Sequence, residues 1–166
     1  ISCSAAVSAC EKGHRWAQAV AILREMRSVA LHPNVVTYSA TISACEKCGQ
    51  WACALHLLAE MRSARVPPNV VAYGAAIGAC DRGRTWEWAL ELLGEMEMRR
   101  LQPDVRVHNA LITACARGQR SARALDVLAS ARAGLVELDA VSYGAAASAC
   151  EAGLLWADAF NLLEEL

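Results

Sequence analysis

The sequence predicts an all-α fold, a right-handed superhelical solenoid of antiparallel helix-turn-helix repeats. Two residue types recur every 35 positions. The cysteines of this series are Cys10, Cys45, Cys80, Cys115 and Cys150. The tryptophans are Trp16, Trp51, Trp86 and, after one omission, Trp156. A period in this range indicates an array of one supersecondary unit rather than a closed domain. The many Ala and Leu residues and the single Phe favour helices over strands.

The period divides the whole chain, 1–166, into one array. Its units are a partial unit 1–34, the complete units 35–69, 70–104 and 105–139, and a partial unit 140–166. Both ends interrupt a repeat, so we treat the chain as a fragment of a longer protein. We expect a monomer.

Each unit carries two helical stripes. Tyr38, Ile42 and Cys45 share one face of a first helix, and Trp51, Leu55 and Leu58 share one face of a second. Glycines between the two stripes are expected to close the first helix in the left-handed conformation. Prolines such as Pro68 end the unit. The predicted pairs are 37–48 with 51–64, 72–82 with 86–99, and 107–117 with 121–133. We expect the first helices to line the concave face of the solenoid and the tryptophans to pack between repeats, with Trp88 partly exposed.

Charge and hydropathy exclude some functions. The formal net charge of −1 does not mark the chain as a binder of polyanions, so a nucleic-acid surface would depend on where the 16 Lys and Arg residues lie. No apolar run is long enough to predict a membrane span. The periodic cysteines follow Ser-Ala or similar small residues in an apolar stretch, which indicates a packed, reduced column in a reducing compartment.

Chemistry-bearing residues do not form a catalytic or metal pattern. Cys45, Cys48, Cys53 and His56 are zinc-ligand types, but they lie on two helices without a second Cys-x-x-Cys, so we predict no metal site and no cofactor. The four histidines occupy non-equivalent positions, and the zinc signature of nucleobase deaminases is absent. We therefore predict that the chain is not an enzyme.

Three segments resemble the pentatricopeptide repeat family. They are Val-Val-Thr-Tyr-Ser at 35–39, Ala-Leu-His-Leu-Leu-Ala-Glu-Met at 54–61 and Val-Pro-Pro-Asn at 66–69. The 35-residue period fits this family better than the 34-residue tetratricopeptide repeat, and the resemblance covers the whole chain. It implies binding of single-stranded RNA, one base per repeat, read by two or three side chains.

The resemblance assigns base selection to the residue after the Tyr position and to the last residue of each unit. The pairs are Ser4 with Asn34, Ser39 with Asn69, Gly74 with Asp104, and Asn109 with Asp139, and Gly144 begins a fifth. Ser/Asn pairs resemble adenine readers and Asn/Asp resembles a uracil reader. Gly/Asp departs from the pattern because Gly lacks a side chain, so that specificity rests on Asp104 and favours guanine. With the amino end at the 5′ end, the implied register is A, A, a weak G, then U.

Two further columns follow from the same resemblance. Bases are wedged between residues at the second position of successive repeats: Ile1, Val36, Val71, Arg106 and Val141. Arg106 breaks the aliphatic series, although a guanidinium can also stack on a base. Phosphates are expected to meet the cations two residues past each cysteine: Lys12, Lys47, Arg82 and Arg117. Without the family, the same cations would be explained as residues that favour a helix carboxy terminus.

The resemblance also implies an address and a role. We expect a mitochondrial or chloroplast protein that acts in RNA processing, editing, stability or translation, with protein partners through flanking regions. The main alternative is a tetratricopeptide-like scaffold for protein–protein interaction, and a second is a structural spacer in a larger enzyme. The polar residues in the selector columns favour RNA, because a peptide-binding groove needs no such pairing.

Overall fold

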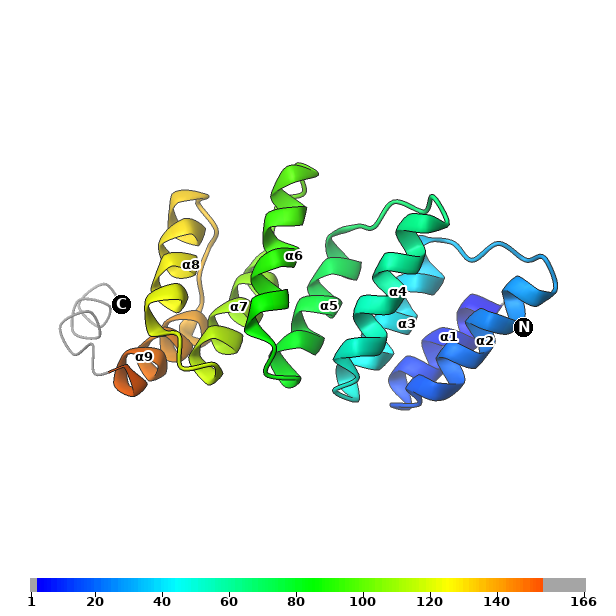
Figure 1. Ribbon diagram of the computed structural model, residues 1–166, viewed down its shortest axis with the longest axis horizontal. Helices are drawn as coiled ribbons and strands as arrows, with labels where there is room; N and C mark the ends of the chain where they lie inside the picture. Colours follow the sequence, from blue (N-terminus) through cyan, green and yellow to red (C-terminus); the bar gives the residue numbers. More distant parts are fainter. Residues whose placement is uncertain (1–2, 154–166) are drawn as a thin grey trace. The chain divides into compact units, whose positions relative to one another are not determined.

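The computed structural model describes residues 3–153, and within that range every regular element is a helix (Figure 1). The helices are α1 Cys3–Lys12, α2 Trp16–Ser28, α3 Val35–Lys47, α4 Trp51–Ser63, α5 Val70–Arg82, α6 Trp86–Met98, α7 Val105–Arg117, α8 Ser121–Ala133 and α9 Ala140–Ala152. The predicted all-α class is confirmed. Trp156, the last member of the predicted tryptophan series, lies outside the described residues.

The first helix of each complete repeat begins two residues earlier than predicted. The prediction placed the starts at 37, 72 and 107, whereas the structure places each start directly after an N-cap. Asn34, Asn69 and Asp104 are the caps, and each is in the extended conformation. An Asn or Asp side chain at this position accepts a hydrogen bond from a backbone N–H that has no partner inside the helix. The cap therefore decides the boundary.

The predicted role of the glycines between the helices is wrong at most positions. Gly83 and Gly118 have φ of −80° and −79°, and the left-handed residue is the next one, Arg84 (φ 56°) or Gln119 (φ 56°). Only Gly49, which is displaced by one position, takes the left-handed conformation itself, with φ 67°. The other glycines must therefore serve a different purpose.

At Gly83 and Gly118 that purpose is space for the tryptophan column. A Cβ on Gly83 would overlap the indole Cδ1 of Trp51, and a Cβ on Gly118 would overlap the indole Cδ1 of Trp86. Glycine thus lets the indole of one repeat approach the end of the next repeat's first helix. The Arg120 guanidinium lies 5.0 Å from the centre of the Trp86 ring, in a cation–π contact. As expected, Trp88 is off this column and is 49% exposed.

The chain divides into two compact units, an N-terminal unit of Ile1–Gly83 and a C-terminal unit of Arg84–Leu166. In the N-terminal unit, α3 packs against α1, α5, its hairpin partner α4, and α2. In the C-terminal unit, α7 packs against α6, α8 and α9. First helices stack on first helices, so each apolar stripe is buried by a neighbouring repeat, as in other repeat arrays. These neighbours can be followed by their labels in Figure 1.

A tyrosine anchors the first helix of the second repeat in the N-terminal unit. Tyr38 on α3 is fully buried, and its hydroxyl donates to Glu60 Oε1 at 3.2 Å. Glu60 in turn pairs with Arg27 on α2, with 2.6 Å between Nη1 and Oε1. Burial, followed by the charge of Glu60, raises the pKa of Tyr38. We call these three side chains the Tyr38 buttress.

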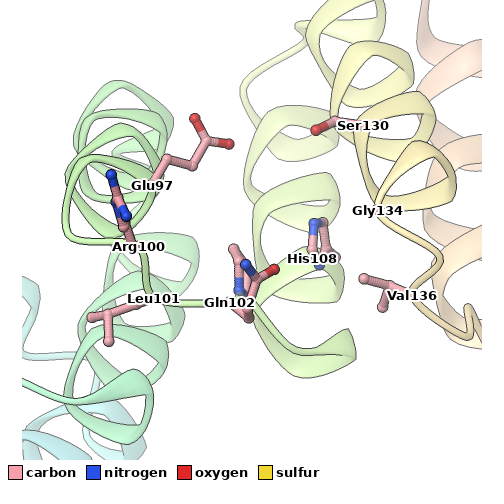
Figure 2. Close-up of a pocket in the computed structure, with 9 residues that line it drawn as sticks. Glu97, Arg100, Leu101, Gln102, His108, Ser130, Gly134 and Val136 are labelled. Carbon is pink, nitrogen blue, oxygen red and sulfur yellow. The ribbon is translucent and has the colours of Figure 1, made fainter.

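The equivalent place in the C-terminal unit is a cavity of about 380 Å³. Residue 108 is His instead of Tyr, residue 130 is Ser instead of Glu, and residue 97 is Glu instead of Arg. Figure 2 shows Glu97 on α6, His108 on α7 and Ser130 on α8 around the opening. The His108 ring is buried, and its Nδ1 lies 2.9 Å from the carbonyl oxygen of Asp104.

All eight cysteines are thiols in this structure. Four members of the periodic column, Cys45, Cys80, Cys115 and Cys150, are buried. Cys10 differs from the expected packed column because it stays partly exposed while it packs beside Val7. No helix within residues 3–153 is long and apolar enough to cross a bilayer.

Candidate nucleic-acid interface

The last residue of each repeat caps the helix that follows it. Asn34 Oδ1 accepts from the backbone N–H of Thr37 at 3.0 Å. The same bond runs from Ala72 to Asn69 at 2.9 Å, from Val107 to Asp104 at 2.9 Å and from Ser142 to Asp139 at 2.9 Å. One of the two polar atoms at the end of each side chain is thereby held in a fixed place.

Capping leaves a different second atom for Asn and for Asp. With Oδ1 engaged, Asn34 and Asn69 retain the Nδ2 amide, which can only donate. Asp104 and Asp139 retain a carboxylate oxygen, which can only accept when ionised. The repeat backbone is the same in both cases, so the residue at this position changes the hydrogen-bonding sense of the surface without changing the fold.

The structure brings two of the predicted selector pairs into direct contact. Ser39 Oγ donates to Asn69 Oδ1 at 3.3 Å. Asn109 Nδ2 donates to both carboxylate oxygens of Asp139, at 3.1 and 3.3 Å. The backbone amide of Ser142, followed by the Asn109 side chain, holds the pKa of Asp139 below its usual range. Asp139 therefore remains an acceptor throughout the neutral range.

The other selectors are arranged differently. Ser4 is linked to Asn34 through Thr37: its Oγ lies 3.2 Å from Thr37 Oγ1, and Thr37 Oγ1 donates to Asn34 Oδ1 at 3.0 Å. Gly74 has no side chain. Gly144 is exposed, and a Cβ placed there would meet nothing within 4 Å.

The second position of the repeats carries exposed apolar side chains. Val36, Val71 and Val141 are 56%, 58% and 60% exposed, although each lies on a helix whose other face is buried. Arg106 holds the same position in α7 and is also exposed. Ile1 lies outside the described residues. A valine exposed at one phase of three repeats is unusual for a solvent face, because apolar side chains at solvent positions are normally scattered.

The cation column is solvent-accessible but is not uniformly available to a ligand. Lys12, Arg82 and Arg117 are exposed at the ends of α1, α5 and α7. Lys47 is less so, and its Nζ lies 3.0 Å from Glu11 Oε1 of the preceding repeat. A phosphate at this place would have to compete with that carboxylate.

Sequence reasoning missed two features of this surface. It treated Asn34, Asn69, Asp104 and Asp139 as selectors only and overlooked that they are N-caps. It also missed the hydroxyls of Thr37 and Ser142, which contact selector residues. The signal for the N-caps was present, since Asn or Asp immediately before an apolar periodic segment is typical of a helix start.

The thiols of the second repeat form a polar contact away from this surface. Cys45 on α3 and Cys53 on α4 share a hydrogen bond, which lowers the pKa of Cys53 to about 7 and, together with burial, raises that of Cys45. Among residues 3–153, no three His, Cys, Asp or Glu side chains converge as metal ligands would.

The profile of the pentatricopeptide repeat domain matches residues 3–48, 21–82 and 91–145. The chain belongs to the pentatricopeptide repeat family. None of the curated protein sequences compared with it matches.

Solved structures support the fold assignment. The pentatricopeptide repeat domain of Arabidopsis thaliana protein-only RNase P 1, in complex with tRNA, is 16% identical, with a TM-score of 0.87 over 99% of this chain and 89% of that one. Maize PPR10 is 26% identical, with a TM-score of 0.74 over 98% of this chain. PPR10 in complex with an 18-nt psaJ RNA element gives a TM-score of 0.79 over 96% of this chain. The chain spans only 23% of the PPR10 chains, so it is comparable to a segment of such an array.

Proposed function

We propose that the chain binds single-stranded RNA in a base-selective way, with one base per repeat. The observation that carries this proposal is the fixed donor or acceptor at each N-cap beside an exposed apolar column. Two of the structural neighbours were solved with RNA, tRNA in one case and the psaJ element in the other, which supports the same ligand class. RNA bases need a flat apolar contact and a polar group at their edge, and this surface offers both.

The chemistry of the base edges matches the two cap types. Adenine and cytosine carry a hydrogen-bond acceptor at the ring nitrogen of the pairing edge, whereas guanine and uracil carry a donor there. The Nδ2 amide of Asn34 or Asn69 complements the first class, and the second carboxylate oxygen of Asp104 or Asp139, which does not cap the helix, complements the second. This gives a physical basis for the register A, A, weak G, U.

The first selector of each pair refines the choice. Ser39 is buried and gives its proton to Asn69, so only the lone pairs of its Oγ would be left to accept from the exocyclic amine of adenine. Asn109 gives one amide hydrogen to Asp139 and retains a second, which can donate to the O4 of uracil. Asn is longer than Ser, which suits the smaller pyrimidine. Gly74 offers no such group, and specificity at its base rests on Asp104 alone.

The valine column and the cation column supply the contacts that do not depend on sequence. Val36, Val71 and Val141 would hold bases between them, and Arg106 would stack where the valine is missing. Lys12, Lys47, Arg82 and Arg117 would meet the phosphates. The ion pair of Lys47 with Glu11 lowers the net gain at that repeat.

The test is a binding series with labelled RNA in which the Asn69→Asp variant is compared with the original chain. Binding to AAGU, with flanking nucleotides, should exceed binding to a scrambled sequence. The substitution keeps the N-cap and exchanges a donor for an acceptor, so preference at the second base should move from adenine to guanine. The shift should correspond to about 1–3 kcal/mol, as for other direct base contacts. Unchanged preference at that base would refute base selection and favour a tetratricopeptide-like protein scaffold.

Lys47→Ala is the matched control for the backbone contacts. Removing a cation from the phosphate column should weaken binding to all sequences alike and make the dependence on salt less steep. Because Lys47 already pairs with Glu11, the loss should be smaller than for Lys12→Ala. If the variant bound every sequence as tightly as the original chain does, with the same dependence on salt, that result would argue against a phosphate role for this column.

The role within a longer protein is part of the same proposal. We infer a non-catalytic, RNA-binding segment that acts in transcript processing, editing, stability or translation in mitochondria or chloroplasts. A structural neighbour named nuclear proteinaceous RNase P 2 matches 99% of this chain at 11% identity, so the shared fold itself fixes no compartment. Fluorescence microscopy of the full-length protein would decide the address.

A further inference from the structure

Two hydroxyls lie behind the base-selecting side chains without facing the solvent. They belong to Thr37 and Ser142, the third residues of α3 and α9, and both side chains are fully buried. Ser142 Oγ lies 2.5 Å from Asn109 Oδ1 and 3.0 Å from Asp139 Oδ1. Thr37 Oγ1 lies 3.2 Å from Ser4 Oγ and 3.0 Å from Asn34 Oδ1. Each hydroxyl therefore touches both selectors of the preceding repeat.

The proton positions at Ser142 follow from the chemistry of its neighbours. The carboxylate of Asp139 only accepts, so the Asn109 group that faces it is the amide nitrogen. The amide oxygen of Asn109 then faces Ser142, and the Ser142 hydroxyl donates to it at 2.5 Å, with Asp139 Oδ1 as a second, longer acceptor at 3.0 Å. Ser142 thus occupies the acceptor of Asn109 and leaves an amide hydrogen as the group that Asn109 can offer to a base.

The same reasoning at Thr37 makes the first selector of that repeat, Ser4, an acceptor rather than a donor. Its single hydroxyl proton goes to Asn34 Oδ1, so the proton between Ser4 and Thr37 must come from Ser4. Ser4 is then left with lone pairs, and it can only accept from a base. A buried hydroxyl at one position therefore fixes Ser4 as an acceptor and Asn109 as a donor.

The two intervening repeats lack this hydroxyl. The third helical residues of α5 and α7 are Ala72 and Val107, which are buried and apolar. Ser39 is held only by its bond to Asn69, and Gly74 has no side chain to hold. The contrast separates the four repeats into two with a positioned first selector and two without.

We propose that Thr37 and Ser142 are positioning residues for base selection, which set the donor or acceptor sense of the first selector in the repeat before them. The inference rests on the proposed RNA binding and extends it to a residue that would not touch the base. It implies sharper discrimination at the first and fourth bases than at the second and third.

The test compares Ser142→Ala with Ser142→Thr, using RNAs that differ only by uracil or cytosine at the fourth base. Cytosine has the size of uracil and the reverse donor and acceptor pattern, so the affinity ratio measures selection alone. Loss of the hydroxyl should reduce this ratio by about two- to tenfold, the range for one hydrogen bond. Ser142→Thr should retain the ratio, because Thr occupies the same position in α3.

Two controls separate positioning from a structural role. Thr113→Val removes a hydroxyl of α7 that donates to the backbone carbonyl of Asn109 at 2.7 Å, and it should leave the ratio unchanged. If Ser142→Ala acted only through its capping box with Asp139, it would weaken binding to both RNAs equally, and that result would overturn the proposal.

A measurement without RNA distinguishes failure of this inference from failure of the proposed function. In nuclear magnetic resonance spectra, the side-chain amide signals of Asn109 should shift in Ser142→Ala and stay near their original positions in Ser142→Thr. Unchanged Asn109 signals in Ser142→Ala would refute positioning, whatever the RNA result. Shifted Asn109 signals in a protein that discriminates no base would refute base selection. They would also refute the claim that the two hydroxyls sharpen that selection.

Discussion

The Tyr38 buttress and the cavity at His108 occupy the same place in two repeats that lie 70 residues apart. In the N-terminal unit, Tyr38, Glu60 and Arg27 link three helices through one hydrogen bond and one ion pair. In the C-terminal unit, the corresponding His108, Ser130 and Glu97 surround a space of about 380 Å³. All three positions differ, and the chemistry differs with them.

The difference shows that the buttress is a unit rather than three separate contacts. Glu60 accepts from Tyr38 and pairs with Arg27, so a change at any one position would leave a partly buried polar group with a lost partner. At the cavity the carboxylate is on α6, the residue on α8 is a small hydroxyl, and the imidazole turns to the backbone of Asp104. The fold tolerates this because both rings still fill the first-helix stripe.

The largest expected effect comes from replacing Tyr38 in the N-terminal unit by the residue type found at the cavity, histidine. Tyr38→His removes the hydroxyl that meets Glu60 and leaves a void at a fully buried site. We expect the free energy of unfolding of α3 and α4 to fall by about 2–4 kcal/mol, the sum of a cavity term and a lost hydrogen bond. Amide hydrogen exchange of these helices is the measurement, because it reports local stability in a repeat array.

Tyr38→Phe is the matched control, since it retains the ring and removes only the hydroxyl. It should cost about 1 kcal/mol. If the amides of α3 and α4 were equally protected from hydrogen exchange in Tyr38→His and in the original chain, the buttress would add nothing to the stability of these helices.

The packed architecture followed from the sequence, whereas the buttress and the interface polarity did not. The 35-residue period and the stripe of Tyr38, Ile42 and Cys45 predict helical hairpins because burial of that stripe needs a neighbour. The pairing of Tyr38 with Glu60 requires knowledge of which faces meet across repeats. For the same reason, the family resemblance predicts Asn69 as a selector, but nothing in the sequence pointed to the hydroxyl of Ser142 behind Asn109. Helix starts were missed by two residues because propensity says less about a boundary than the cap does.

Thiol reactivity extends the comparison to the cysteine column. Cys45 and Cys115 are equivalent, but Cys45 faces Cys53, whereas Cys115 has Arg123 at the corresponding place. The pKa of Cys53 is lowered to about 7 by its bond to Cys45, and burial raises the pKa of Cys115 to about 11. Thiolate is the reactive form, so Cys53 should be alkylated at pH 7 about a hundredfold faster than Cys115, after allowing for the lower nucleophilicity of a more acidic thiol.

Mass spectrometry of peptides after timed iodoacetamide treatment provides the rates. Cys45→Ala should slow the reaction of Cys53, because it removes the hydrogen-bond donor that lowers the pKa of the Cys53 thiol. Similar rates of alkylation at Cys53 and Cys115 in the original chain would contradict the view that the two repeats give their cysteines different environments.

The smallest expected effect comes from building the buttress into the C-terminal unit with His108→Tyr, Ser130→Glu and Glu97→Arg together. The phenol would fill part of the cavity and donate to the new carboxylate, as Tyr38 does to Glu60. The new ion pair adds little, because the Arg27 side chain in the existing pair is 51% exposed and such pairs contribute at most about 1 kcal/mol. The imidazole contact with the Asp104 carbonyl is lost in exchange. The net gain for α7 and α8 should therefore be about 1 kcal/mol, measured by hydrogen exchange.

His108→Tyr alone should gain less, because Ser130 is too short to meet the phenol. If the triple variant were less stable than the original, the residues around the cavity would form a stabilising arrangement of their own. The cavity would then be more than a buttress that has lost its three side chains.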